Sequence, residues 1–450
     1  MRLRLKIGCV FSAVVAAALY GGGAWAEDSL PVIVLDSPAP SSVDVPVSVD
    51  VVMPIDATRC RETTCAATFG LIEIDAQGKP ISDRILPAQF VPKEETGGGD
   101  DRSEGIPGTL WWLLPASDKR SDGATQRRFR VVEQETATPV VRIEASDDGG
   151  TYRFVQSVGE DRATPLLQYN WKQVPVPEGT PPHFAAGQSY LRGDYIHPLF
   201  GPNGRVLTDD YPADHPHHRG IWWTWPVVRW NDRVGDIWAV VDVWAFPVAV
   251  ERVVSGPVFA ELTVTNVWKF GAEKTPIVRE TVRIRAFRRS PQGEGLLEVE
   301  VRLLALCDNV SIAGRPKASY GGQGGYSGFA LRAAPADGQK ITPFVDPPEK
   351  ELRCSWLDYV ANFDGKGPAG MTLVEHPSNP GYPNPWYEYP NLNCVMPSWP
   401  EEREVAVPRD KPIVLRYRMW VHSGETVPAK CGDVWRSFAS PPNGRSESAR

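Results

Sequence analysis

The sequence predicts an all-β protein, in which a large antiparallel β-sandwich is preceded by a small β-sandwich domain. The 450-residue chain contains 40 Gly and 43 Pro, a content that suits many short strands joined by turns. It also carries three successive runs of alternating apolar and polar residues, Val258–Phe270, Thr275–Phe287 and Leu296–Leu306. Such alternation is typical of antiparallel strands with one buried face. We find no amphipathic helix longer than a few turns.

The amino terminus has the three parts of a secretory signal peptide. Three cations precede an apolar run, and Ala24-Trp25-Ala26 matches an A-x-A cleavage site. We therefore expect residues 1–26 to be removed and the protein to be periplasmic or secreted. The alternative is an uncleaved anchor helix, which the short apolar run does not favour.

The remaining chain divides into three predicted parts. Residues 27–148 form the small β domain, where Val43–Val51 alternates as a strand and Pro46 favours an edge position. Residues 149–438 form the large β domain, which includes a further strand at Pro412–His422. Residues 439–450 are polar, and we expect them to be disordered.

Composition excludes two classes of partner. The chain has 48 Lys+Arg against 55 Asp+Glu, so its formal charge is −7 and a nucleic-acid partner is not expected. After the signal, no apolar run reaches the ~18–20 residues of a membrane helix. We therefore expect no membrane span in the mature chain.

Six cysteines follow the signal peptide, and an oxidising compartment favours disulfides. Cys60 and Cys65 lie close enough in sequence to close one turn. Further suggested pairs are Cys354 with Cys394 and Cys307 with Cys431. No C-x-x-C spacing supports a zinc or redox site.

The strongest chemical signal is the histidine-rich segment D-H-P-H-H-R-G at residues 214–220. In an extended backbone, which Pro216 favours, His215 and His217 project to one side, and His218 faces away beside Arg219. Two imidazoles on one side can divide acid and base roles or ligate a metal. Metal binding needs a distant third ligand, such as His197, His376 or Asp236. The structural alternative is a loop whose histidines only hydrogen-bond carbonyl groups.

Two aromatic stretches accompany the histidines. The first contains Trp222, Trp223, Trp225, Trp230 and Trp238, and the second is the proline-rich loop His376–Pro390 with Trp386, Tyr387 and Glu388. Flat rings beside acids and imidazoles are typical of sites that bind sugars, although aromatic clusters are more often core. Further candidate carboxylates are Asp194, Asp214, Asp232 and Asp236. No G-x-S-x-G elbow supports a serine hydrolase.

Six motifs resemble a bacterial family of unknown function that is labelled PmoA-like or "methane oxygenase". They are H-P-L-F-G-P-N-G (197–204), D-H-P-H-H-R-G-I-W (214–222), G-D-I-W (235–238), G-G-Y-S-G-F-A-L-R (324–332), H-P-S-N-P…P-W-Y (376–387) and L-R-Y-R-M-W-V-H (415–422). The resemblance covers about Gly149–Gly424. It implies a secreted protein with a mutarotase-like supersandwich fold and favours His215, His217, His218, Arg219, Asp236, His376 and Trp386 as site residues. Methane oxidation is rejected, because the membrane segments of that enzyme are absent.

We therefore predict a secreted carbohydrate-active protein, a glycoside hydrolase or related sugar-cleaving enzyme, whose partner is a polysaccharide or oligosaccharide. The predicted catalytic residues are His215, His217, His218, Asp236, His376 and Glu388. The predicted substrate-binding residues are Arg219, Trp222, Trp223, Trp238, Trp386 and Tyr387. A sugar-binding protein without catalysis, and an enzyme with a divalent metal on the histidines, are the alternatives. No cofactor is firmly implied.

Overall fold

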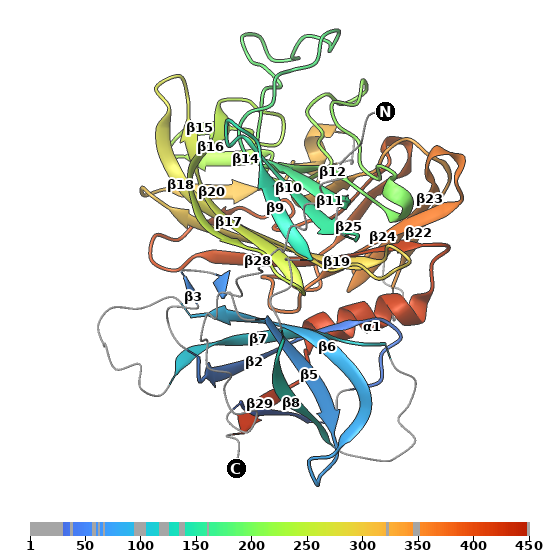
Figure 1. Cartoon of the computed structure of the whole chain (residues 1–450). Coiled ribbons are helices and arrows are strands. Elements are labelled where there is room, and N and C mark those ends of the chain that lie inside the picture. The colour runs from blue at the N-terminus through green and yellow to red at the C-terminus, as the bar shows by residue number, and fades with distance from the viewer. Residues whose placement is uncertain are drawn as a thin grey trace, which may run out of the picture.

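A computed structural model describes the chain at residues 30–36, 39–55, 60–61, 64–65, 68–93, 105–116, 126–134, 140–159, 162–320, 324–344 and 352–447. The predicted signal peptide lies outside these ranges. Within them, nearly all regular structure consists of antiparallel strands, which confirms the all-β class (Figure 1). Short 3-10 turns occur at η3 (Pro202–Gly204), η4 (Lys317–Tyr320), η5 (Phe363–Gly365) and η6 (Pro390–Leu392).

Sheet I belongs to the amino-terminal unit. Its strand order is β2 (Val45–Met53), β7 (Ile106–Leu114), β6 (Pro80–Pro92), β5 (Thr68–Ile74), β8 (Gln126–Gln134), β1 (Val32–Asp36) and β29 (Gly444–Glu447). The sheet curls around one apolar core until its two edges lie side by side, with the Ser446 hydroxyl 3.4 Å from the Asp50 carbonyl oxygen. Val45, Val47, Val49 and Val51 of β2 all point into the core while Ser48 and Asp50 face solvent, as the alternation predicts, and β2 is an edge strand.

The larger unit is a sandwich of two eight-stranded sheets. Sheet II has the order β25 (Trp386–Tyr389), β26 (Cys394–Pro397), β21 (Gly328–Arg332), β13 (Ile221–Thr224), β12 (Tyr195–Leu199), β11 (Ala163–Asn170), β10 (Thr151–Ser157) and β9 (Val141–Ala145). Sheet III has the order β16 (Val243–Val254), β17 (Phe259–Phe270), β18 (Thr275–Phe287), β19 (Gly295–Ala305), β28 (Ile413–Ser423), β24 (Pro368–Glu375), β23 (Trp356–Asn362) and β22 (Asp337–Pro343). A small sheet of β15 (Arg233–Gly235), β14 (Val227–Trp230), β20 (Val310–Ala313) and β27 (Val405–Ala406) adjoins them.

The alternating runs predicted from sequence are confirmed as β17, β18 and β19, and the later run as β28. One apolar core joins the facing sides of sheets II and III, for example Trp223 of β13 with Val264 of β17 and Val299 of β19. Residues of opposite parity on the same strands therefore point outward. This alternation leaves each sheet one outer face on which function can be built.

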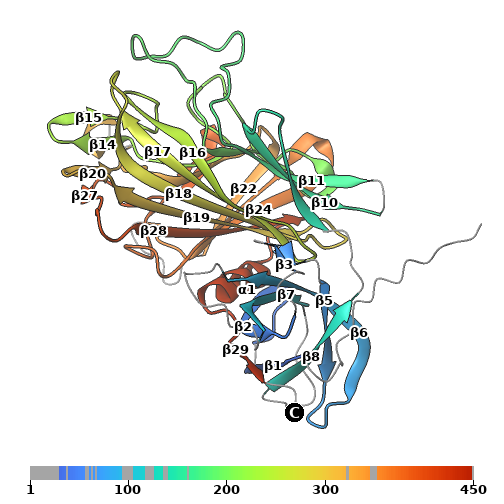
Figure 2. The same cartoon turned by 60° about the vertical axis from the view of Figure 1, so that its left-hand side comes forward.

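A third apolar cluster holds the two units together. It joins Val43 and Leu113 of the amino-terminal unit to Phe259 and Trp420 on the outer side of sheet III. Helix α1 (Pro428–Ala439) lies between the units and contributes Val434 to the same cluster (Figures 1 and 2). No helix in the described part of the chain is long and apolar enough to cross a bilayer.

The carboxyl terminus differs from the predicted disordered tail. Gly444–Glu447 forms β29, which pairs with β1 from Val32↔Glu447 to Leu35↔Gly444. The polar sequence is no obstacle, because a strand on an exposed edge needs only backbone hydrogen bonds. Residues 448–450 lie outside the described ranges. The predicted boundary at residues 148 and 149 stays a prediction, and β9, which precedes it, already pairs with β10 (Thr151–Ser157) in sheet II.

The suggested distant disulfides are wrong. Cys307, Cys354, Cys394 and Cys431 are all free thiols. Cys354 lies in the sandwich core, Cys394 on the outer side of sheet II and Cys431 in α1, so different layers separate them. Cys60 in β3 (Cys60–Arg61) stands opposite Cys65 in β4 (Thr64–Cys65), and their side chains lie outside what the structure describes.

Candidate acid–base site

The histidine-rich segment forms two consecutive turns instead of the predicted extended backbone. The His215 amide donates to the Pro212 carbonyl at 3.1 Å, and the His218 amide donates to the His215 carbonyl at 2.8 Å. Because of these turns, the rings of His215 and His218 stack at 4.8 Å between centroids. The His217 ring stands edge-on to both, 5.6 Å from His215 and 4.8 Å from His218. All three predicted imidazoles therefore meet, although the local geometry differs from the prediction.

The Arg219 side chain stabilises these turns by donating hydrogen bonds to their carbonyl groups. Its side chain is fully buried and donates to the carbonyls of Pro216 (2.6 Å), His218 (2.7 Å) and Tyr190 (2.7 Å). Its guanidinium lies 3.5 Å from the Tyr211 ring centroid. The predicted role of Arg219 in binding substrate does not match this position, because burial leaves no donor for a ligand. Arg219 positions the loop.

Asp214 and Arg332 support His215. Arg332, buried at the end of β21, donates to both carboxylate oxygens of Asp214 at 2.8 and 3.1 Å. Burial would raise the pKa of Asp214, but the hydrogen bonds and charge of Arg332, together with His215, bring that pKa below its ordinary value. The His215 Nδ1 lies 3.3 Å from Asp214 Oδ2, and its side chain is 38% exposed. An ionised carboxylate therefore lies within ion-pair distance of one nitrogen of a partly exposed imidazole, without a hydrogen bond of good geometry, and the other nitrogen stays available to a reactant.

The other two imidazoles are kept neutral. Burial, reinforced by the positive fields of His215, Arg192 and Arg219, lowers the pKa of His217 to about 3. Burial also lowers the pKa of His218 well below its ordinary value. An Arg332 guanidinium nitrogen lies 3.4 Å from His218 Nδ1, so the His218 Nδ1 atom is the acceptor of this contact. The site thus combines an imidazole paired with a carboxylate and a neighbouring imidazole that stays unprotonated.

Aromatic rings extend outward from the histidines over sheet II. Trp222 lies 5.1 Å from His218, Trp238 5.1 Å from Trp222, and Tyr326 5.0 Å from Trp238. Tyr389 and the predicted Tyr387 continue this series, with parallel rings 6.3 Å apart. Trp222 and Trp238 pack on each other but are buried, so neither presents a ring face to a substrate in this structure. The Tyr387 hydroxyl donates to Glu401 at 2.6 Å, which fixes its ring.

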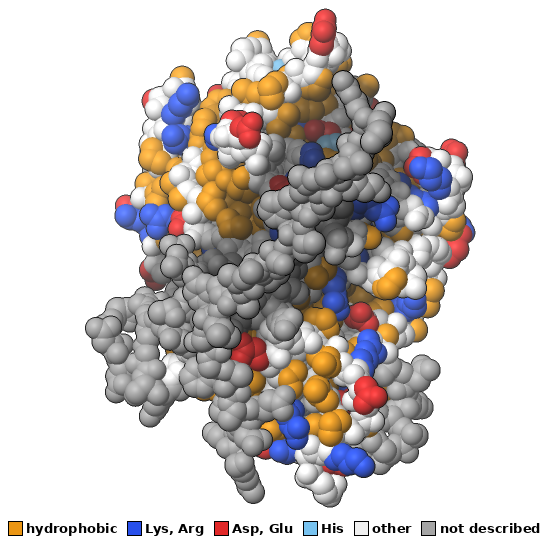
Figure 3. Space-filling model, in the orientation of Figure 1, with side chains coloured by type: hydrophobic (Ala, Val, Ile, Leu, Met, Phe, Trp, Pro, Cys, Tyr) orange, Lys and Arg blue, Asp and Glu red, His pale blue; other side chains and the backbone are white. Residues whose placement is uncertain are grey.

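A second aromatic group comes from the loop before β12. The His183 ring stacks on Phe184 at 4.6 Å and packs on Tyr190 at 4.3 Å, and both of these rings face His217 at 6.4 and 6.3 Å. Phe184 is 67% exposed, an unusual position for a large apolar ring. On the face in Figure 3, histidine, acidic and basic side chains lie beside one another in the upper half.

Asp236 lies behind this surface. Its carboxylate accepts the Ala239 amide at 2.8 Å and pairs with Arg315. Burial raises the pKa of Asp236 although Arg315 opposes that shift. Both carboxylate oxygens have protein partners, and the residue reaches the histidines only through Trp238. Asp236 therefore stabilises the turn that leads to Ala239.

Four predicted site residues lie elsewhere. Trp223 and Trp386 point into the sandwich core, and the Trp386 indole donates to the Cys354 carbonyl at 2.8 Å. Glu388 has the parity of Trp386, so it points inward while Tyr387 points outward. His376 lies on the other side of the sandwich, 4.7 Å from Phe438 of α1, with its Nδ1 accepting the Ser378 hydroxyl at 2.8 Å. Tyr387 is connected to the histidines only through the rings of Tyr389, Tyr326 and Trp238, so the direct meeting of the two loops stays a prediction.

The candidate metal ligands do not converge. In the described ranges, no group of three or more His, Cys, Asp or Glu side chains has the arrangement of a metal site. His376 is on the opposite face, and His197 bonds through Nδ1 to the Thr208 hydroxyl at 3.0 Å. Burial lowers the pKa of His197 to about 4.

Sequence reasoning listed Asp214 only as one of several carboxylates and missed Arg332, Phe184 and Tyr190. Asp214 and Arg332 were visible as parts of separate motifs, but their pairing depends on β13 and β21 lying side by side. No pattern in the sequence marks Phe184 or Tyr190.

Comparisons with known proteins place the chain in a family. Residues 160–436 match the family of unknown function DUF6807, and because this match spans more than half of the chain, the protein belongs to that family. No curated protein matches. Among solved structures, the chain is similar to a protein in glycosyl hydrolase family 38 from Enterococcus faecalis, with a TM-score of 0.38, 9% identity and coverage of 95% of this chain and 48% of that one. It is also similar to an alpha-mannosidase from Enterococcus faecalis V583, with a TM-score of 0.34, 8% identity and coverage of 95% and 47%. The chain spans about half the length of either structure.

Proposed function

We propose that this DUF6807 protein is a carbohydrate-active enzyme that cleaves sugars by proton transfer at His215, which Asp214 positions and His217 assists. The observation that supports this proposal is the chain of contacts Arg332–Asp214–His215, which ends at a solvent-accessible imidazole nitrogen. A carboxylate beside one imidazole nitrogen favours a fixed orientation of the ring. This is the arrangement needed by a general acid.

The two imidazoles suit different roles because their environments differ. Beside anionic Asp214, His215 can carry the proton that a departing glycosidic oxygen needs. His217, whose pKa is lowered to about 3, is neutral and a weak base, and its imidazole can accept a hydrogen bond from water or a hydroxyl and so orient it. The ring centroids are 5.6 Å apart, so both imidazoles can serve one bound sugar.

The aromatic surroundings favour a carbohydrate as the reactant. Phe184 presents an exposed ring beside His217, and the partly buried Tyr326, Tyr387 and Tyr389 pack on the cluster that contains Trp222 and Trp238. Aromatic rings bind the apolar C–H faces of sugars while neighbouring polar groups take the hydroxyls. These rings also support a second candidate function, a sugar-binding protein without catalysis. A periplasmic or secreted location, predicted from residues 1–26, is part of the proposal.

A product survey tests the proposal. The mature protein, His215→Gln and the control His376→Gln are incubated with a panel of plant and algal glycans, and new products are identified by mass spectrometry. We expect products from the wild type and from His376→Gln, and none from His215→Gln. Equal products from all three proteins would refute the assigned site. Glycan binding without any product would favour the binding protein.

A further inference from the structure

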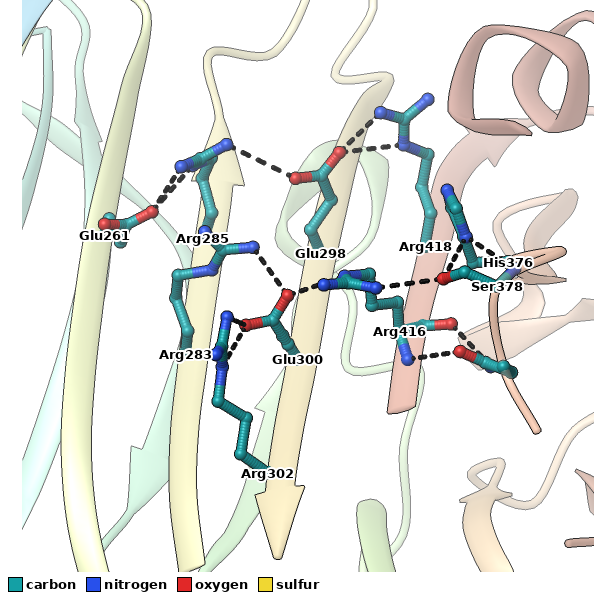
Figure 4. A network of polar contacts seen from close by, with 11 residues as sticks. Glu261, Arg283, Arg285, Glu298, Glu300, Arg302, His376, Ser378, Arg416 and Arg418 are labelled. Atoms are coloured by element: carbon teal, nitrogen blue, oxygen red, sulfur yellow. Dashed lines mark hydrogen bonds and ion pairs between the residues drawn. The ribbon is translucent and has the colours of Figure 1, made fainter. Parts of the chain in front are cut away.

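The outer face of sheet III carries a ladder of charged side chains. Figure 4 shows arginine and glutamate side chains on neighbouring strands, directed to the same side. Strand pairing arranges them in two rows: Glu261, Arg285, Glu298 and Arg418 form the first, and Thr263, Arg283, Glu300 and Arg416 form the second. Arg302, two residues beyond Glu300 on β19, joins the second row through its contact with Glu300.

The first row is covered and balanced in charge. Arg285 lies 4.1 Å from the Trp111 ring centroid of the amino-terminal unit, and Arg418 lies 4.4 Å from the Phe438 ring centroid of α1. Only 7% and 4% of these two side chains are exposed. Two arginines share two glutamates in this row, as expected because buried charges need partners.

The second row is open and unbalanced. Arg283, Arg302 and Arg416 are 36%, 45% and 34% exposed, and all three bind Glu300, at 3.2, 2.7 and 2.7 Å. Glu300 is itself only 6% exposed. Three guanidinium groups therefore share one buried carboxylate, and most of their N–H donors face solvent.

The positions of these guanidinium groups are fixed before any ligand arrives. Each holds one or two bonds to Glu300, and Arg416 also donates to the Ser378 hydroxyl at 2.9 Å. Burial would raise the pKa of Glu300, but the three arginines bring it below its ordinary value, so the carboxylate stays charged and keeps them in place. The pKa of the neighbouring His376 is lowered, first by burial and then by the positive charges of Arg416 and Arg418.

We propose that Arg283, Arg302 and Arg416 form a docking surface for an anionic polysaccharide, one that carries sulfate or carboxylate groups. Guanidinium groups suit these anions because their planar donors match two oxygens at once. Thr263, which stands beside Arg283 at the end of this row, adds a hydroxyl that a glycan chain can contact. The second row contains no aromatic ring for base stacking, which favours a glycan over a single-stranded nucleic acid.

This surface is independent of the proposed acid–base site, which lies on sheet II. Its occupant would tether the enzyme to a charged matrix without entering the catalytic site. Failure of the two proposals is therefore distinguishable: docking must survive His215→Gln, and turnover of small substrates must survive loss of the arginines.

Three dextrans with one backbone provide the test: dextran sulfate, carboxymethyl-dextran and uncharged dextran. We expect the wild type and His215→Gln to bind both charged forms, more weakly as salt increases, and to leave uncharged dextran unbound. The variant Arg283→Gln/Glu300→Gln/Arg302→Gln/Arg416→Gln removes the row without leaving a buried carboxylate unpaired. It should lose about tenfold or more in affinity, because three cationic contacts to the polyanion are lost.

Two further variants keep the result interpretable. Arg302→Gln leaves Glu300 with two arginines, so it should fold normally and still bind less tightly than the wild type. The control Arg84→Gln/Arg153→Gln changes the net charge as much as the fourfold variant does, at other exposed positions. Undiminished binding by the fourfold variant, an equal loss in the control, or tighter binding to duplex DNA or anionic phospholipid vesicles than to dextran sulfate would each overturn the proposal.

Discussion

The two outer faces of the sandwich gather polar groups in opposite ways. On sheet II, the imidazoles of His217 and His218 are desolvated among rings and stay neutral, and only His215 meets both a carboxylate and solvent. On sheet III, permanently charged arginines and glutamates form rows whose charges balance where they are covered. The first face carries imidazoles, two of which stay neutral, whereas the second carries guanidinium groups whose charge does not change.

This contrast suits the histidine face of sheet II to catalysis and the arginine face of sheet III to docking. Proton transfer needs a group that can exist in two states, and only the histidine face supplies one in contact with solvent. The arginine face supplies fixed charge, which can hold a partner but cannot act as an acid or base near neutral pH. The following variants test this difference between the two faces.

The largest stability effect is expected in the covered row of sheet III. Arg418→Met leaves Glu298 with a weaker partner, Arg285 at 3.5 Å, in a largely buried position. We expect a loss of about 3–5 kcal/mol in the free energy of unfolding, as for other broken buried pairs. Arg302→Gln in the open row should cost less than about 1 kcal/mol. Equal losses in urea unfolding would contradict the distinction between the two rows.

Arg332→Met tests the support beneath the histidine face. The Asp214 carboxylate is 41% exposed and can regain water, so we expect a smaller loss of about 1–3 kcal/mol. Turnover should fall as well, because Asp214 loses the group that keeps its pKa low and its position fixed. A variant with unchanged turnover would show that Arg332 does not act through Asp214.

Acid should weaken the fold through the buried imidazoles. The pKa of His217 is lowered from 6.5 to about 3, so the unfolded chain takes up this proton first as pH falls. The free energy of unfolding should therefore decrease between about pH 6.5 and pH 3, and stability should be fully present above that range. His217→Gln should reduce the slope, and Val248→Ala, at an exposed position away from the histidines, should leave it unchanged. A His217→Gln protein with the wild-type slope would argue against a desolvated ring.

The smallest effect is expected at the exposed ring of Phe184. Phe184→Ala removes an aromatic contact of about 0.5–1.5 kcal/mol, which corresponds to a modest rise in KM for a sugar substrate. Stability should change by less than about 0.5 kcal/mol, because the ring is largely in solvent. Val248→Ala, at another exposed apolar position, serves as the control for KM. An unchanged KM in Phe184→Ala would remove this ring from the sugar surface.

The regular strands were predictable because their alternation directly reflects one buried face. The runs at β17, β18 and β19 were located within about one residue for this reason. The site was predictable only in part. The three histidines are neighbours in sequence, so any compact turn brings them together. Glu388 was misplaced because the parity of a strand in a proline-rich loop is not visible from its sequence. The partnership of Asp214 with Arg332 spans 118 residues and depends on sheet topology.

A double-mutant cycle on Asp214 and His215 tests the central claim most directly. Turnover of one identified glycan is compared for the wild type, Asp214→Asn, His215→Gln and the double variant, each checked for wild-type thermal stability. If the two residues act as one unit, His215→Gln should lose about 10²–10⁴-fold and the double variant should lose no more than that. Losses that multiply in the double variant, or full turnover in His215→Gln, would contradict an acid–base pair at this site.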